Sequence, residues 1–311
     1  MTMLSRVADR LYWMSRYLER VEDTARLTLS YTHLIMDIPQ GSDLGWDTLV
    51  KILDGEPSYL EHYRVFNEQN VLKFLIADRD NPCSIPFAVK SARENVRTTR
   101  DVLPAEAWEH VNELHLYVEE MADKSVGRRN RYAFLEQIIG RCQMINGLLM
   151  TTLPRGRASG FIKVGHLLER SDMTTRVIDV GAAAISSRAQ PDPALDALLW
   201  GSLLRSLSAM TAYRRSVGPL VEADAVVDLV FKDATLPRSV VFCLNGIREE
   251  LKSLKNCDDS LKILDRARRR VNRFATVRMP RSLLHEFIDE FQMGLNELNG
   301  VIAATWFLSD S

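Results

Sequence analysis

One polar motif occurs twice in this chain, and the repetition limits the folds that the chain can adopt. Residues 18–26 read Leu-Glu-Arg-Val-Glu-Asp-Thr-Ala-Arg, and residues 168–176 read Leu-Glu-Arg-Ser-Asp-Met-Thr-Thr-Arg. The two copies lie 150 residues apart, and Trp46 and Trp200 recur after them at a spacing of 154. Landmarks that recur in the same order at a nearly constant spacing indicate two similar halves.

A second pair of matching segments supports this interpretation. Pro82-Cys-Ser84 is followed by Arg93, and Pro237-Arg-Ser239 is followed by Arg248, so that matched residues lie 155 apart. Proline suits the first turn of a helix and serine caps its exposed N–H groups, so each segment predicts a helix start. A helix start with a nearby arginine could also bind an anion. We place the two halves at residues 1–153 and 154–311, within a single compact domain.

The pattern of apolar residues predicts an all-α fold. The first segment has an apolar residue every three or four positions, namely Leu4, Val7, Leu11, Met14, Leu18, Val21 and Ala25. This spacing is typical of a helix that packs against other helices. We expect a duplicated, pseudo-symmetric helical bundle with about six helices per half. After the first helix these are 43–54, 57–79, 84–101, 105–125, 130–152, then 158–188, 194–209, 211–232, 238–255, 259–275 and 281–308.

Composition argues against several classes of function. The net charge of −1 gives no general attraction to nucleic acids or anionic membranes. No apolar stretch is long enough to span a bilayer. The four cysteines have no metal-binding or disulfide spacing, which favours a reduced, cytoplasmic protein. No nucleotide-binding loop or nucleophile motif is present.

The acids and arginines of each motif lie on one helical stripe. In the first copy these are Glu19, Glu22 and Arg26, spaced i, i+3 and i+7, and in the second copy Glu169, Asp172 and Arg176. In the second copy the adjacent apolar line also becomes polar, with Ser171 and Thr175. This indicates a buried or cleft-facing site. Buried charges are costly unless they are paired, so we expect the charged groups to form a network.

Two interpretations of this network remain open. The motifs could form an ion-pair lattice that holds the helices in register. Alternatively, acids beside arginines could bind an amino-acid-like ligand, with arginine gripping its carboxylate. In that case Glu169 or Asp172 is the candidate acid/base. The candidate substrate-binding residues are Glu19, Arg20, Glu22, Arg26, Arg170, Arg176, Ser84, Arg93, Arg238, Ser239 and Arg248.

We predict no metal site and no cofactor. The run His166-x-x-Glu169-x-x-Asp172 puts three possible ligands on one face, but Arg16 replaces the histidine in the first copy. The arginines at 128–131 and 266–273 are typical of a solvated helix face. Their functional alternative is a docking face for an acidic partner, because no aromatic residues alternate with them as in a nucleic-acid site.

The opening segment, from Met3 to the Glu19-Arg20 pair, resembles the bacterial alpha-E family, an all-helical family with a Glu-Arg motif. The motif maps onto Glu19-Arg20 and Glu169-Arg170. Family members are typically encoded beside a circularly permuted ATP-grasp protein, often with a transglutaminase-like protein. The resemblance therefore implies peptide or amide-bond chemistry in which this protein is a partner or a second catalyst.

Three functional hypotheses follow. The chain is an accessory protein that presents an amino-acid or peptide substrate to an ATP-grasp ligase. Alternatively, it is an enzyme that acts on activated amino-acyl or peptide substrates. In the third hypothesis it is a structural scaffold, and the motif is purely architectural. The polar line in the second copy favours that copy as the functional one.

Overall fold

The computed structural model describes residues 4–38, 44–186, 192–276 and 281–308, and these residues form an all-α fold without strands. In the first half the helices are α1 (Ser5–Asp37), α2 (Asp47–Ile52), α3 (Glu56–His62), α4 (Glu68–Ile76), α5 (Ile85–Arg97), α6 (Ala105–Met121) and α7 (Arg128–Thr152). In the second half they are α8 (Arg157–Ser186), α9 (Pro193–Ser206), α10 (Met210–Ser216), α11 (Ala223–Lys232), α12 (Val240–Lys252), α13 (Asp258–Arg273) and α14 (Arg281–Trp306). Two short 3-10 helices, η1 (Arg100–Val102) and η2 (Asp123–Ser125), flank α6.

The described part of each half contains seven α-helices, one more than the sequence pattern predicted. The segments expected as single helices at 57–79 and 211–232 each divide into two, α3 with α4 and α10 with α11. In the first half the side chain of Asn67 caps a new helix start. In the second half Gly218 adopts a positive φ of 139° directly before a proline, which ends α10. The helices follow the same order in both halves; their origin by duplication stays a prediction.

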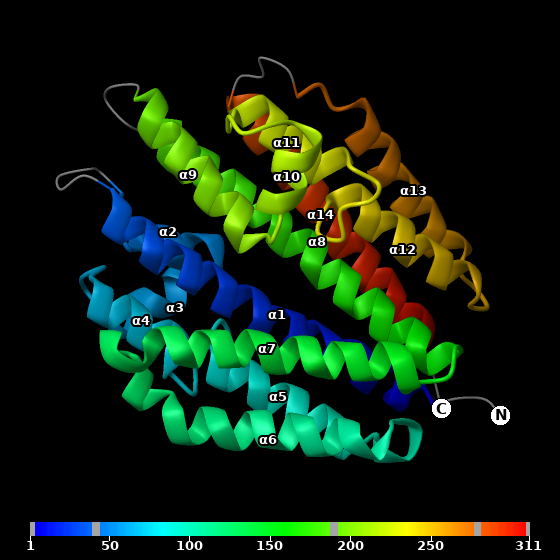
Figure 1. Cartoon of the computed structure of the whole chain (residues 1–311). Helices are drawn as coiled ribbons and strands as arrows, with labels where there is room; N and C mark the ends of the chain where they lie inside the picture. Colours follow the sequence, from blue (N-terminus) through cyan, green and yellow to red (C-terminus); the bar gives the residue numbers. More distant parts are fainter. Residues whose placement is uncertain (1–3, 39–43, 187–191, 277–280, 309–311) are drawn as a thin grey trace.

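The two longest helices, α1 and α8, lie side by side at the centre of the molecule (Figure 1). Each also packs on helices of both halves: α1 on α5, α7 and α9, and α8 on α12, α14 and α2. The α1–α8 contact is therefore the axis around which the two halves are arranged. It carries both copies of the repeated motif.

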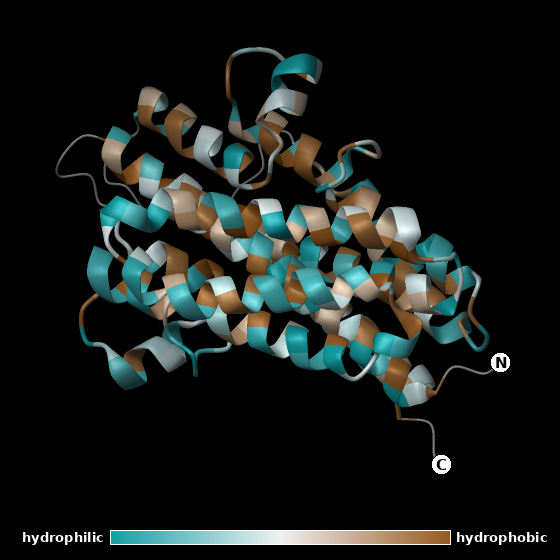
Figure 2. Cartoon of the chain, turned by 60° about the horizontal axis from the view of Figure 1, so that its bottom comes forward, coloured by the Kyte–Doolittle hydropathy of each residue, from teal (hydrophilic) through white to brown (hydrophobic). Residues whose placement is uncertain are grey.

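The apolar core crosses the boundary between the halves. Its larger cluster combines Tyr12 and Leu27 of α1 with Val164 of α8 and Leu204 of α9. A smaller cluster, with Leu11 and Phe134, lies mainly within the first half. Apolar and polar residues alternate along the outer helices (Figure 2), as amphipathic packing requires. Among the described helices, none is long and apolar enough to cross a membrane.

The close approach of α1 and α8 depends on a glycine. A Cβ atom at Gly165 would lie 2.4 Å from both the backbone oxygen of Tyr12 and the hydroxyl oxygen of Ser15. The backbone of α1 cannot move away without separating the two central helices. A small residue at this position therefore lets the charged motifs of both helices come within hydrogen-bonding distance.

Gly165→Ala is expected to destabilise the protein by about 1–3 kcal/mol, the usual cost of overpacking a well-packed contact. The matched control is Gly147→Ala in α7, where an added Cβ meets no atom within 4 Å. That substitution should raise stability by about 0.5–1 kcal/mol, because alanine favours a helix more than glycine does. Urea unfolding of both variants measures the difference. Equal effects would contradict the close approach of α1 and α8.

Candidate functional site

The two Glu-Arg motifs pair reciprocally across the α1–α8 contact. Glu19 of the first motif accepts hydrogen bonds from Nε and Nη2 of Arg170 in the second, at 2.5 and 3.1 Å. Glu169 of the second motif accepts one from Nε of Arg20 in the first, at 2.6 Å. The glutamate of each motif thus binds the arginine of the other, and the repeat forms a single two-part structure.

Further arginines, and for Glu19 also the imidazole of His166, lie close to both glutamates, which are buried. Glu19 lies 3.2 Å from Nη1 of Arg238 and 3.1 Å from Nδ1 of His166. Glu169 accepts a second hydrogen bond from Nε of Arg16, at 2.7 Å. Burial alone would raise the pKa of each glutamate, but the surrounding cations outweigh it and the pKa values lie below their usual range. Both glutamates therefore stay ionised at neutral pH.

The cluster around Glu19, which we call the closed side, pairs its acids and arginines internally. Arg238 of the loop before α12 is only 6% exposed and contacts Glu19, Glu22 and Asp23. Glu22 also accepts a 2.8 Å hydrogen bond from Nε of Arg26. Three acids, namely Glu19, Glu22 and Asp23, thus face three arginines, namely Arg26, Arg170 and Arg238.

Burial also shifts two titratable groups on the closed side. It raises the pKa of Asp23 to about 8, with Glu19 and Glu22 adding to the shift against the opposing effect of Arg238. One carboxylate oxygen of Asp23, Oδ2, has no hydrogen-bond partner. Burial lowers the pKa of His166 to about 4, so this imidazole is neutral at pH 7, with Nδ1 at 3.1 Å from Glu19.

The cluster around Glu169, which we call the open side, is more accessible. The side chains of Arg20, Arg176 and Asp172 are 25%, 24% and 22% exposed. Asp172 accepts a 2.9 Å hydrogen bond from Nε of Arg176, and burial raises its pKa. Arg176 also lies 3.4 Å from Asp54, a carboxylate that is 76% exposed. Such an exposed ion pair contributes little stability.

The open side carries excess positive charge among its motif residues because Arg16 stands in place of His166 and Met173 in place of Asp23, which together outweigh the loss of an arginine at Cys83. Cys83 occupies the position in the repeat that Arg238 occupies on the closed side, and Met173 replaces Asp23. Arg16, Arg20 and Arg176 therefore face only two motif acids, Glu169 and Asp172. The Cys83 thiol donates to the backbone oxygen of Leu53 at 3.2 Å. Burial raises the pKa of this thiol, while Arg20 and Arg176 act in the opposite direction.

The predicted helix starts have a clear capping role. The hydroxyl of Ser84 accepts from the backbone N–H of Phe87 at the start of α5, and that of Ser239 accepts from Phe242 at the start of α12. Both serines are buried. Anion binding at these helix starts stays a prediction.

The structure does not bring Arg93 and Arg248 to the motif cluster. Nε of Arg93 donates to Asn112 of α6 at 2.8 Å, and Nε of Arg248 donates to Asp265 of α13 at the same distance. These matched pairs tie α5 to α6 and α12 to α13. Of the predicted binding residues, the cluster therefore contains Glu19, Arg20, Glu22, Arg26, Arg170, Arg176 and Arg238.

Arg16, Asp54 and Cys83 belong to the site but were not predicted from the sequence. The difference between Cys83 and Arg238 in the two Pro-x-Ser segments was visible in the repeat. Its effect on the charge of the site depends on how the loop before α5 packs against α1 and α8, which no local sequence pattern specifies. Arg16 was visible only as the counterpart of His166.

One group of side chains could offer ligands to a metal ion. Atoms of Asp179, His285 and Asp289 lie within 4.8 Å of one another. However, Nδ1 of His285 lies 2.9 Å from Asp179, whereas Nε2 lies 3.5 Å from Asp289. The two carboxylates thus face opposite nitrogens of one ring, an arrangement that suits hydrogen bonding better than convergence on one ion.

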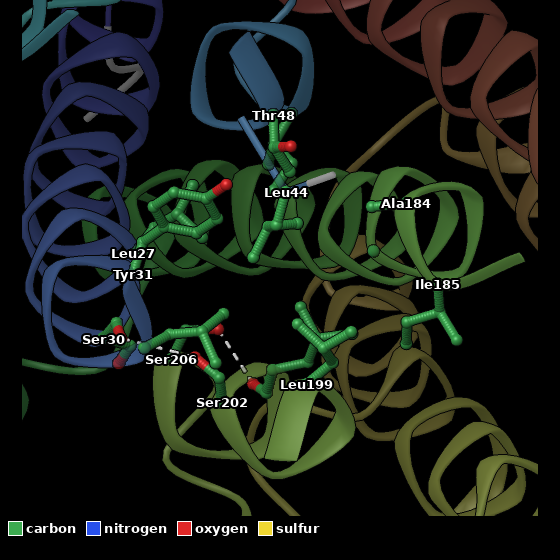
Figure 3. Close-up of a pocket in the computed structure, with 14 residues that line it drawn as sticks. Leu27, Ser30, Tyr31, Leu44, Thr48, Ala184, Ile185, Leu199, Ser202 and Ser206 are labelled. Atoms are coloured by element: carbon green, nitrogen blue, oxygen red, sulfur yellow. Dashed lines mark hydrogen bonds between the residues drawn. The ribbon is translucent and has the colours of Figure 1, made fainter. Parts of the chain in front are cut away.

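A separate cavity lies between α1, α2, α8 and α9 (Figure 3). It is lined mostly by apolar side chains, with Ser30, Ser202 and Ser206 at one side. The hydroxyl of Ser202 donates to the backbone oxygen of Ser30, at 3.3 Å. The cavity encloses about 20 Å³, room for a water molecule but not for an amino acid. The partly exposed arginines of the open side are therefore the better candidate for ligand binding.

Comparison with known proteins places this architecture in a family. The Alpha-E family, described as a predicted alpha-helical domain with a conserved ER motif, matches residues 3–307. The chain therefore belongs to the Alpha-E family. Both of its Glu-Arg dipeptides, Glu19-Arg20 and Glu169-Arg170, take part in the reciprocal pairing described above.

The curated relatives are longer proteins. An uncharacterised protein of Mycobacterium bovis and one of Mycobacterium tuberculosis are each 26% identical over 278 residues. The match covers 82% of this chain but only 30% of each relative. No solved structure matches the chain with significance.

Proposed function

We propose that this chain is an accessory protein that presents the carboxylate of an amino acid or peptide to an ATP-grasp-type amide ligase in the bacterial cytoplasm. The observation that carries the proposal is the excess positive charge of the open side, where three arginines face two motif acids. Arg176 contributes most directly, because its contact with exposed Asp54 is weak and a ligand carboxylate can replace it.

The state of Glu169 supports an accessory role over a catalytic one. Both of its carboxylate oxygens accept hydrogen bonds from arginines, and its pKa is lowered. A general acid must hold a proton near neutral pH, and this carboxylate does not. The raised pKa of Asp172 favours the alternative, an enzyme with Asp172 as its base. The burial of both glutamates also fits the scaffold hypothesis for the motif core.

The greater length of the relatives supports the proposal that this chain acts with a partner protein. In each of them, about 70% of the chain lies outside the region that matches this protein. A region that is joined to other segments in its relatives is expected to act together with another protein here. An ATP-grasp ligase is the partner that the family resemblance suggests, and a transglutaminase-like protein is a further one.

The test compares two equivalent arginines in an ATP-consumption assay with the ligase and pooled amino acids. The purified chain should stimulate amino-acid-dependent ATP use. Arg176→Gln should reduce that stimulation about tenfold, because a charge-assisted contact with the carboxylate is lost. Arg26→Gln is the matched control, since Arg26 has the same i, i+4 pairing with Glu22 on the closed side.

Three results would count against this proposal. A ligase that is fully active without this chain would contradict the accessory role. Equal effects of the two substitutions would remove the open side as the binding site. Turnover by this chain alone that is lost in Asp172→Asn would favour the enzyme alternative.

A further inference from the structure

The outer helix of the second half carries a row of exposed arginines. Arg266, Arg269, Arg270 and Arg273 of α13 are spaced i, i+3, i+4 and i+7, so they share one face. Together with Phe274 and Phe287 they line a surface groove of about 440 Å³. Helix α13 lies at the edge of the molecule, packed on α12 and α14 (Figure 1). We call this feature the α13 groove.

The charges of the α13 groove are only partly balanced. Nη2 of Arg270 lies 2.8 Å from Glu290, and Nη1 of Arg266 lies 3.5 Å from Glu297, both in exposed pairs. Arg269 and Arg273 have no acidic partner among the described residues. An exposed helix face of this kind needs solvent or an external anion to satisfy its guanidinium groups.

The floor of the groove is apolar. The rings of Phe274 and Phe287 stack with their centroids 3.6 Å apart and their planes at 20°. Phe287 is buried, whereas Phe274 is partly exposed. An aliphatic side chain can therefore pack on Phe274 while flanking carboxylates reach the arginines above it.

We infer that the α13 groove docks a short acidic segment of a partner protein, with glutamate or aspartate on Arg269 and Arg273 and an apolar side chain on Phe274. The arginine row spans seven residues of helix, roughly 10 Å, which matches about three extended residues. Because Glu290 and Glu297 pair with Arg270 and Arg266, the unpaired charge is confined to Arg269 and Arg273, which suits a short acidic segment better than a long phosphate backbone. The docking site is separate from the open side, so it stands whether or not the proposed function holds.

The test measures binding of a labelled synthetic peptide that alternates glutamate and leucine, by fluorescence anisotropy on the full chain. The double variant Arg269→Glu with Arg273→Glu should weaken binding about tenfold. The matched control is the double variant Arg214→Glu with Arg215→Glu on α10, which makes the same change in charge at exposed positions. It should bind the peptide as tightly as the unmodified protein does. Binding should also weaken as salt is added.

Two probes separate an acidic segment from other ligands. A peptide with glutamine in place of glutamate should not bind, and single-stranded oligothymidylate of equal charge should bind more weakly than the acidic peptide. Absence of peptide binding, or equal loss in both double variants, would overturn the inference. Tighter binding of the oligonucleotide, lost in the Arg269/Arg273 variant, would instead identify a nucleic-acid site. All of the substituted side chains are exposed, so the variants should fold, and circular dichroism checks that they do.

Discussion

Glu19→Gln is expected to lower the free energy of unfolding by about 3–5 kcal/mol, the cost of breaking a buried ion pair from one side. Glu19 is fully buried, and the substitution leaves Arg170 and Arg238 without their shared carboxylate. Glutamine retains the shape and one acceptor oxygen, so lost charge rather than lost volume causes the effect. Urea unfolding at neutral pH measures it.

The matched control for Glu19→Gln is the same substitution at Glu249. That glutamate is 66% exposed and pairs with Lys252 on the surface of α12. Surface pairs of this kind contribute about 0–1 kcal/mol, so Glu249→Gln should have little effect. A Glu19→Gln variant as stable as the Glu249→Gln variant would contradict the structural role of the motif.

Arg238→Gln is expected to lower the free energy of unfolding by a similar amount, about 3–5 kcal/mol. This loss should increase as the pH rises. Without Arg238, the carboxyls of Glu19, Glu22 and Asp23 lose their shared cation. Burial already raises the pKa of Asp23 to about 8, and removal of the arginine raises it further. An acid whose pKa is higher in the folded state than in the unfolded state loses stability as pH rises.

The destabilisation by Arg238→Gln should therefore be greater near pH 9 than near pH 5, because Asp23 of the unmodified protein ionises above about pH 8 whereas Asp23 of the variant stays protonated. Unfolding of the variant and the unmodified protein at several pH values tests the sign. A loss of stability that is independent of pH, or greater near pH 5, would show that the three carboxyls do not share Arg238. Arg26→Gln, with one acidic partner, should show a smaller effect.

The fold was largely predictable because its information is local. The apolar spacing of α1 and the serine caps of α5 and α12 are patterns within single helices. The sequence pattern did not predict the break between α3 and α4, because the apolar spacing continues across it. Asn67, the N-cap residue of α4, lies within that continuous pattern. Gly218 and Pro219 were visible, and they should have divided α10 from α11.

The site was less predictable because its contacts join distant residues. The acids and arginines of the motifs were identified, but their partners were not. Glu19 and Arg170 lie 151 positions apart, and Arg238 lies 215 from Asp23. Local spacing favoured pairs within one helix, such as Glu22 with Arg26. It did not indicate that each glutamate binds the arginine of the other motif, because that depends on the close approach of α1 and α8 at Gly165.

Differences between the two sides suggest how one repeated structure could acquire two roles. On the closed side, Arg238 completes a largely buried cluster in which three acids face three arginines. On the open side, Cys83 replaces that arginine, and the remaining arginines stay partly exposed. In the function that we propose, the same helix pair stabilises the fold at one end of the cluster and holds a carboxylate at the other.

Glu19 and Arg170 form a buried pair that joins the two motifs, and a double-mutant cycle tests this pairing most directly. The unfolding free energies of Glu19→Gln, Arg170→Gln and the double variant are measured at neutral pH. We predict a coupling energy of roughly 2–3 kcal/mol, because removal of both partners leaves fewer unpaired charges than removal of either one. Additivity within about 0.5 kcal/mol would contradict the reciprocal pairing of the motifs.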